Sequence, residues 1–95
     1  MTIEEQIAAE IAAGNTKVAE YYTKHNCQYC ARTKLLLDEL GYTKFERDAV
    51  AERDALIQRI TDITGSPPTT VPQIFINNVY VGGFNELEAL LKSQY

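Results

Sequence analysis

Two cysteines, Cys27 and Cys30, are the residues of this chain whose type and spacing point most directly to chemistry. They are the only cysteines among the 95 residues, and a helical pattern runs from residue 31 to residue 40 directly after them. A helix that begins at a cysteine points its unpaired backbone N–H groups and the positive end of its dipole at the sulfur, which favours the thiolate over the thiol. Since the thiolate is the reactive form, this placement predicts thiol chemistry.

The two sulfur atoms are expected to play unequal roles. A free cysteine with a pKa near ~8.5 is only about 3% thiolate at pH 7, whereas a pKa two units lower makes it roughly three-quarters ionised. The helix end and Lys24 can together supply such a shift. Cys27, at the exposed helix tip, is therefore the predicted nucleophile. Cys30, about one turn further in, is the predicted resolving cysteine, which attacks a mixed disulfide and releases the substrate thiol.

The CxxC pair by itself leaves three other interpretations open. A permanent disulfide staple would close only a short loop, which removes about 2 kcal/mol of chain entropy and less than a longer loop would. A structural zinc site needs four ligands, and the chain offers two sulfurs and one histidine, His25, which we expect on an exposed loop. The third alternative is a pair of buried cysteines that are neighbours by accident.

Size and charge limit the classes of function. The chain length fits a single domain, and a net charge of −4 with a pI of about 4.9 would repel nucleic acid and anionic membrane surfaces. The sequence shows neither a signal-peptide pattern nor a run of about 18 apolar residues. We therefore expect a reducing, cytoplasmic compartment, where a CxxC pair is more often catalytic or metal-binding than a permanent staple.

The elements that must position the cysteines follow from apolar periodicity and from end signals. Helices are predicted over residues 3–13, 27–40 and 51–64, and a final helix is predicted after a cap formed by Asn85 and Glu88. In the third helix the apolar residues Leu56, Ile60 and Ile63 fall at helical spacing, and in the second helix Leu36, Leu37 and Leu40 are expected to face inward. Strands are predicted over residues 17–22, 42–48, 73–76 and 79–81. The order αβαβαββα predicts an α/β fold with one mixed four-stranded sheet and helices on both faces.

Three segments together resemble the glutaredoxin family: residues 23–30 (TKHNCQYC), 70–76 (TVPQIFI) and 82–87 (GGFNEL). The resemblance spans about residues 17–91 and implies the thioredoxin fold, with residues 1–15 as an additional N-terminal helix on a single domain of residues 1–95. It implies a glutathione-dependent enzyme that reduces protein disulfides and glutathione mixed disulfides through Cys27 and Cys30. It further implies a monomer without a metal, and disulfide-bearing partner proteins, with ribonucleotide reductase as one candidate.

The resemblance also implies a glutathione site beside the cysteines. A cis Val71-Pro72 bond would turn the Val71 backbone toward Cys27, where it can pair with a bound cysteinyl peptide. One ligand carboxylate would rest on backbone N–H groups where the last helix begins. The implied glutathione-binding residues are Lys24, Tyr29, Thr70, Val71, Pro72, Gly83, Phe84 and Asn85.

Some residues depart from the family pattern. Gln28 stands where many dithiol members have proline, and Asn85 replaces a frequent aspartate, which removes one charge near the ligand's ammonium group. Arg53, Gln58 and Arg59 are alternative candidates for a carboxylate contact from the third helix.

Two alternative functions stay open. Because some family members without that proline bind clusters, the first is a scaffold in which Cys27 and two glutathiones hold a [2Fe-2S] cluster between two chains. The second is a thioredoxin-like protein served by a reductase. The absence of tryptophan and the presence of the GGFN segment favour glutathione over this second alternative.

Overall fold

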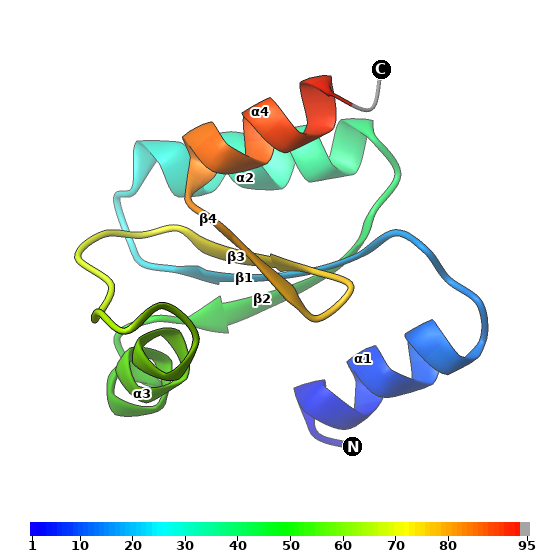
Figure 1. Cartoon of the computed structure of the whole chain (residues 1–95). Coiled ribbons are helices and arrows are strands. Elements are labelled where there is room, and N and C mark those ends of the chain that lie inside the picture. The colour runs from blue at the N-terminus through cyan, green and yellow to red at the C-terminus, as the bar shows by residue number, and fades with distance from the viewer. Residues whose placement is uncertain (94–95) are drawn as a thin grey trace.

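The computed structural model describes residues 1–93 as a mixed α/β structure (Figure 1). Its elements, in chain order, are α1 (Ile3–Ala12), β1 (Val18–Thr23), α2 (Gln28–Glu39), β2 (Thr43–Asp48), α3 (Arg53–Thr64), β3 (Gln73–Ile76), β4 (Val79–Gly82) and α4 (Phe84–Lys92). This order confirms the predicted αβαβαββα pattern. Within residues 1–93, no helix has the length and apolar character needed to cross a membrane.

The four strands form one sheet in the order β2-β1-β3-β4. β1 runs parallel to β2 and antiparallel to β3, and β4 is antiparallel to β3. α2 and α4 cover one face of the sheet, and α1 and α3 lie on the other (Figure 1). The predicted mixed sheet with helices on both faces is therefore confirmed.

β1 is buried along its whole length, because it lies inside the sheet with helices on both sides. Neighbouring side chains of a strand point to opposite faces. Tyr21 therefore joins one core, which includes Leu37 of α2 and Leu87 of α4. Tyr22 joins a second core on the opposite face, which includes Leu56 of α3.

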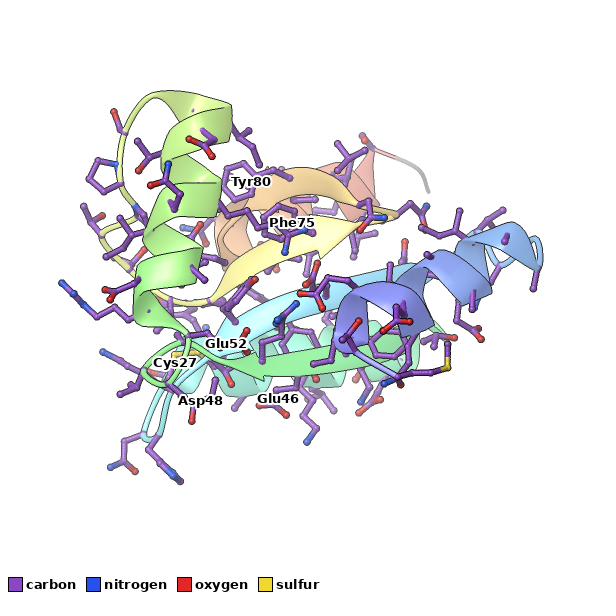
Figure 2. The ribbon with its side chains drawn as sticks, turned by 90° about the horizontal axis from the view of Figure 1, so that it is seen from below. Cys27, Glu46, Asp48, Glu52, Phe75 and Tyr80 are labelled. Carbon is purple, nitrogen blue, oxygen red and sulfur yellow. A yellow bond between two sulfur atoms is a disulfide. The ribbon has the colours of Figure 1, made fainter. Side chains whose placement is uncertain are left out.

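Glu20 is a charged residue within the buried strand β1, and only 3% of its surface is exposed. Arg47 of β2 and Arg59 of α3 each donate a hydrogen bond to its Oε2 at 2.9 Å. Arg47 also pairs with Glu4 of α1 and with Glu52, which Figure 2 labels near the start of α3. A buried carboxylate is costly unless it is paired, so the arginines stabilise this charge and link α1, β1, β2 and α3.

The start of α4 differs from the predicted one. The helix begins at Phe84 with Gly83 as its N-cap, so the predicted cap of Asn85 and Glu88 is wrong. Gly83 has no side chain that could accept a hydrogen bond from the helix. Instead the carboxylate of Glu86 accepts from the Gly83 N–H at 3.2 Å, which satisfies one backbone donor at the helix end.

α3 is two residues shorter at its start than predicted. It begins at Arg53 because the Asp48 carboxylate accepts hydrogen bonds from the N–H groups of residues 50–51 and holds a turn there. Ile63, near the end of the helix, is 53% exposed. Leu56 and Ile60 belong to the core cluster beneath α3, and Ile63 does not.

Leu37 and Leu35 test the packing of α2. Leu37 is fully buried, and Leu35 is 60% exposed. We expect Leu37→Ala to lower the free energy of unfolding by about 2–5 kcal/mol, because it removes buried methyl groups and leaves a cavity. Leu35→Ala should change it by less than about 0.5 kcal/mol. Urea unfolding of both variants measures the difference, and equal losses would contradict this packing.

Candidate active site

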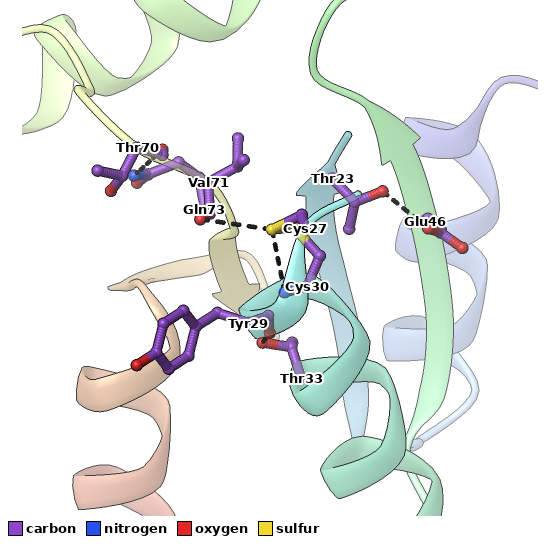
Figure 3. The surroundings of a disulfide bond; sticks show 9 residues. All are labelled: Thr23, Cys27, Tyr29, Cys30, Thr33, Glu46, Thr70, Val71 and Gln73. Atoms are coloured by element: carbon purple, nitrogen blue, oxygen red, sulfur yellow. Dashed lines mark hydrogen bonds between the residues drawn. A yellow bond between two sulfur atoms is a disulfide. The ribbon is translucent and has the colours of Figure 1, made fainter. Parts of the chain in front are cut away.

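Cys27 and Cys30 are joined by a disulfide at the start of α2, with their Cα atoms 5.2 Å apart (Figure 3). Cys27 is the N-cap residue of α2, and its Sγ accepts a hydrogen bond from the Cys30 N–H at 3.2 Å. Cys27 is half-buried, whereas Cys30 is 5% exposed. An incoming thiol or disulfide can therefore reach the first sulfur more easily than the second.

The first turn of α2 holds the sulfur of Cys27 over the helix N-terminus. Asn26 has a φ of 54°, a left-handed conformation that asparagine adopts more readily than most residues, and it turns the chain into the helix. The buried Thr33 donates from its hydroxyl to the Tyr29 carbonyl at 2.8 Å and braces this turn. When the disulfide opens, the backbone N–H groups of the turn stabilise negative charge on Cys27.

The Val71-Pro72 peptide lies beside the sulfurs and is cis, as the sequence resemblance implies. The Val71 carbonyl oxygen is 3.8 Å from Cys27 Sγ (Figure 3). The antiparallel pairing of β1 and β3 sets Tyr22 opposite Gln73. The loop after β1 and the loop before β3 therefore meet at the same edge of the sheet, which brings residues 44 positions apart into contact.

A hollow of about 290 Å³ opens beside the cis proline, and we call it the proline hollow. It gathers seven of the eight residues predicted to bind glutathione, and one residue that the sequence analysis missed, Glu86. The ring centroids of Tyr29 and Phe84 are 5.8 Å apart, so α2 and α4 contribute a shared aromatic pair to it. The sequence contains a pattern that could have identified Glu86, because a glutamate three residues after a helix N-cap is typical of a capping box. The lining residues are Tyr29, Thr70, Val71, Pro72, Gly83, Phe84, Asn85 and Glu86.

Lys24 is the predicted site residue that does not line the proline hollow. It is exposed and lines a neighbouring hollow, the lysine hollow, which shares Thr70 and Val71 with the first. His25, next in the chain, is exposed as predicted. Both hollows therefore border the loop that carries the cis proline.

The structure separates the three candidates on α3. Arg59 is held by Glu20, and its guanidinium lies 3.6 Å from the ring centroid of Phe75. Gln58 donates a hydrogen bond to an aspartate of its own helix. Arg53 is the candidate that lines the lysine hollow. Among the described residues, no group of three or more His, Cys, Asp or Glu side chains is placed to hold a metal ion.

Gly82 is a second residue that the sequence analysis missed. Its φ is +120°, where residues with a side chain are strained, and a Cβ there would lie 3.0 Å from Glu86. A Cβ on Gly83 would make only ordinary contact, 3.5 Å from the Pro72 carbonyl oxygen. Gly82 is thus the glycine that the turn from β4 into α4 requires.

A family model described as glutaredoxin matches residues 19–81, which is more than half of the chain. The chain belongs to the glutaredoxin family. Among its relatives, glutaredoxin 3 of Escherichia coli strain K12 is 42% identical over 74 residues, which cover 75% of this chain and 82% of that protein.

Solved glutaredoxin structures share the fold. The dithiolic glutaredoxin of Trypanosoma brucei brucei matches with a TM-score of 0.69 and 28% identity, covering 99% of this chain and 90% of that one. A buckwheat glutaredoxin–glutathione complex matches with a TM-score of 0.68 and 25% identity, covering 98% and 88%. This glutaredoxin-family chain thus has the thioredoxin fold with an N-terminal helix, and its Cys27–Cys30 pair makes it a thiol–disulfide oxidoreductase.

The unequal burial of the two sulfurs predicts unequal reactivity after reduction. We expect iodoacetamide to modify Cys27 at least about tenfold faster than Cys30 at pH 7, because Cys27 is more exposed and caps the helix. Both cysteines fall in one tryptic peptide, so fragmentation mass spectrometry after short reaction times measures both rates. In denatured protein the two should react alike. Faster labelling of Cys30 in the folded protein would overturn the assignment.

Proposed function

We propose that this family member reduces protein disulfides and glutathione mixed disulfides, with glutathione as its reductant. The observation that supports this most strongly is the proline hollow, which gathers Tyr29, residues 70–72 and the start of α4 beside Cys27. A tripeptide with a central cysteine and two charged ends would extend from this hollow into the lysine hollow, with its sulfur at Cys27. The related buckwheat protein was solved as a complex with glutathione.

Each part of the tripeptide would have a matching feature of the chain. The backbone N–H and C=O of Val71 would pair with the cysteinyl residue like a short strand. Lys24 and Arg53 would meet one carboxylate across the lysine hollow, and the first N–H groups of α4 would meet the other. Glu86 would place near the ligand's ammonium group the negative charge that Asn85 lacks.

The reaction consists of successive thiol–disulfide exchanges. The Cys27 thiolate attacks the glutathione sulfur of a mixed disulfide, and the protein sulfur leaves as a thiolate that takes up a proton. A second glutathione thiolate then attacks that glutathione sulfur, which forms glutathione disulfide and frees Cys27. With a protein disulfide, Cys27 first bonds to the protein and Cys30 resolves the intermediate, which forms the Cys27–Cys30 disulfide. Two glutathiones reduce this disulfide again.

We further propose that residues 1–95 act as a single glutaredoxin domain, with residues 1–15 as an N-terminal extension, and that it works as a monomer in the cytoplasm. A reducing compartment suits a cysteine pair that must return to the thiol state after each turnover. Its partners would be disulfide-bearing proteins, with ribonucleotide reductase as a candidate through the family resemblance.

Replacing each cysteine separates the two roles. Cys27→Ser should lower turnover at least about a hundredfold, because a serine hydroxyl is not ionised at neutral pH and is a weak nucleophile. Cys30→Ser should keep the reduction of glutathione mixed disulfides, which needs only the first sulfur, and lose the dithiol reduction of protein disulfides. NADPH consumption coupled to glutathione reductase measures both activities. Retained turnover in Cys27→Ser would show that the assignment is wrong.

Arg53 and Gln58 form a matched pair on α3. Arg53→Gln should raise the KM for a glutathione mixed disulfide by about three- to tenfold with little change in kcat, because it removes an exposed charged hydrogen bond to the ligand. Gln58→Ala should leave both constants unchanged, since Gln58 bonds within its own helix. Steady-state kinetics of the two variants decides this. An unchanged KM in Arg53→Gln would exclude Arg53 as a carboxylate contact.

A further inference from the structure

Gln73 and Tyr80 form a hydrogen-bonded chain that ends on the loop beside Cys27. The Tyr80 hydroxyl of β4 donates to Gln73 Oε1 at 2.5 Å. Gln73 Nε2, at the start of β3, donates to the Thr70 carbonyl oxygen at 2.8 Å (Figure 3). Gln73 is 5% exposed. We call this arrangement the Tyr80 relay.

The groups at the two ends of the Tyr80 relay determine which atom donates in each of its hydrogen bonds. A backbone carbonyl only accepts hydrogen bonds, so the amide nitrogen of Gln73 must face Thr70 and its oxygen must face Tyr80. The Tyr80 hydroxyl must therefore donate. Burial raises the pKa of Tyr80, and the charge of Glu86 raises it further, so the hydroxyl keeps its proton in neutral solution.

The ring of Tyr80 is held in place by its neighbours. Its centroid lies 5.3 Å from that of Phe75, which is 1% exposed and belongs to the core beneath α3. Figure 2 shows both residues on this face of the sheet. The hydroxyl that starts the relay is therefore anchored in the core and does not depend on a mobile surface side chain.

The far end of the relay acts on the peptide group that carries the Val71 N–H. The Thr70 carbonyl and the Val71 N–H belong to one planar trans peptide, so they point in opposite directions. A hydrogen bond from Gln73 that holds the carbonyl thus also sets where the Val71 N–H points. The same bond polarises the peptide and strengthens that N–H as a donor.

The Val71 N–H would face the side on which the substrate sulfur arrives. A residue before proline is restricted to extended conformations, in which its own N–H and C=O point to the same side. The Val71 C=O lies 3.8 Å from Cys27 Sγ, so this side is the one that faces the reactive cysteine.

We propose that Gln73 and Tyr80 are positioning residues of the exchange reaction, which hold the Thr70-Val71 peptide so that the Val71 N–H meets the backbone of the incoming cysteinyl substrate. This inference rests on the proposed function, in which Val71 pairs with glutathione. Neither side chain touches the reacting sulfurs. Their effect is on substrate binding and therefore on KM, while the chemistry of Cys27 is unaltered.

Tyr80→Phe removes one hydroxyl and keeps the ring, and the chain offers a matched control in Tyr22→Phe. The Tyr22 hydroxyl accepts a hydrogen bond from Arg59 at 3.1 Å, and its ring belongs to the same core. Tyr22 pairs with Gln73 only through the strand backbone, which Tyr22→Phe keeps, so the lost hydroxyl is not part of the relay. Both variants lose one part-buried hydrogen bond, so both should be somewhat less stable. Only Tyr80→Phe should raise the KM for a glutathione mixed disulfide, by roughly three- to tenfold, with kcat changed less than about twofold.

Gln73→Met supplies a second variant of similar length that cannot donate to the Thr70 carbonyl and offers the Tyr80 hydroxyl only a weak sulfur acceptor. It should raise KM by at least as much as Tyr80→Phe. The KM of the double variant should be no higher than that of Gln73→Met alone. Once Gln73 no longer connects Tyr80 to Thr70, removing the Tyr80 hydroxyl has no further effect on the Thr70 carbonyl. Additive KM effects of the two changes, or a KM effect of Tyr22→Phe as large as that of Tyr80→Phe, would overturn the relay.

A spectroscopic measurement distinguishes failure of the relay from failure of the proposed function. In Cys30→Ser, glutathione can be held on Cys27 as a mixed disulfide, and the Val71 amide proton can be followed by NMR. A downfield shift on loading that is smaller when Tyr80→Phe is added supports the relay. An equal shift in both proteins overturns the relay and leaves the glutathione site intact. No shift with Tyr80 present overturns the backbone pairing of Val71, and the relay with it.

Discussion

The burial of β1 on both faces is the constraint on which the rest of the structure depends. Its side chains enter the two cores alternately, so the sheet must carry helices on both sides. Its parallel partner β2 and antiparallel partner β3 then decide which loops meet at its end. Because Tyr22 pairs with Gln73, the chain that leaves β1 toward Cys27 emerges beside the chain that enters β3 after Pro72. The reactive edge is thus a consequence of strand pairing.

The same strand explains why Arg59 of α3 has a structural role whereas Arg53 of the same helix lines the candidate site. The Glu20 carboxylate is buried inside the sheet, where an unpaired charge is costly, and Arg47 and Arg59 both pair with it. Arg59 is therefore committed to Glu20 and to the ring of Phe75. Arg53, about one and two-thirds turns earlier in α3, is exposed and borders the lysine hollow. The two arginines look alike in the sequence but differ in burial and therefore in role.

Three loops form the reactive edge: the loop before α2, the loop between β4 and α4, and the loop before β3. A different local interaction orders each of them. Cys27 is the N-cap of α2, and its Sγ accepts a hydrogen bond from the Cys30 N–H. Gly82 adopts a backbone conformation that only glycine readily accepts, so β4 can turn into α4. The loop before β3 is held from within the sheet, by the Gln73 side chain on the Thr70 carbonyl. Side-chain hydrogen bonds to backbone groups thus order the segments that the strand pairing brings together.

Local patterns in the sequence determined the order of the elements, the CxxC at a helix start and the motifs that surround it. These features depend on periodicity, capping and turn residues within a few positions of each other, which sequence alone displays. Local pattern failed at the start of α4, where the helix begins at Phe84 and Glu86 caps Gly83. Only the tertiary structure decided which side chains share the proline hollow, which arginine is committed to Glu20 and that Tyr80 reaches Thr70 through Gln73. Those outcomes depend on contacts between distant segments, and strand pairing and burial choose such contacts after the local elements have formed.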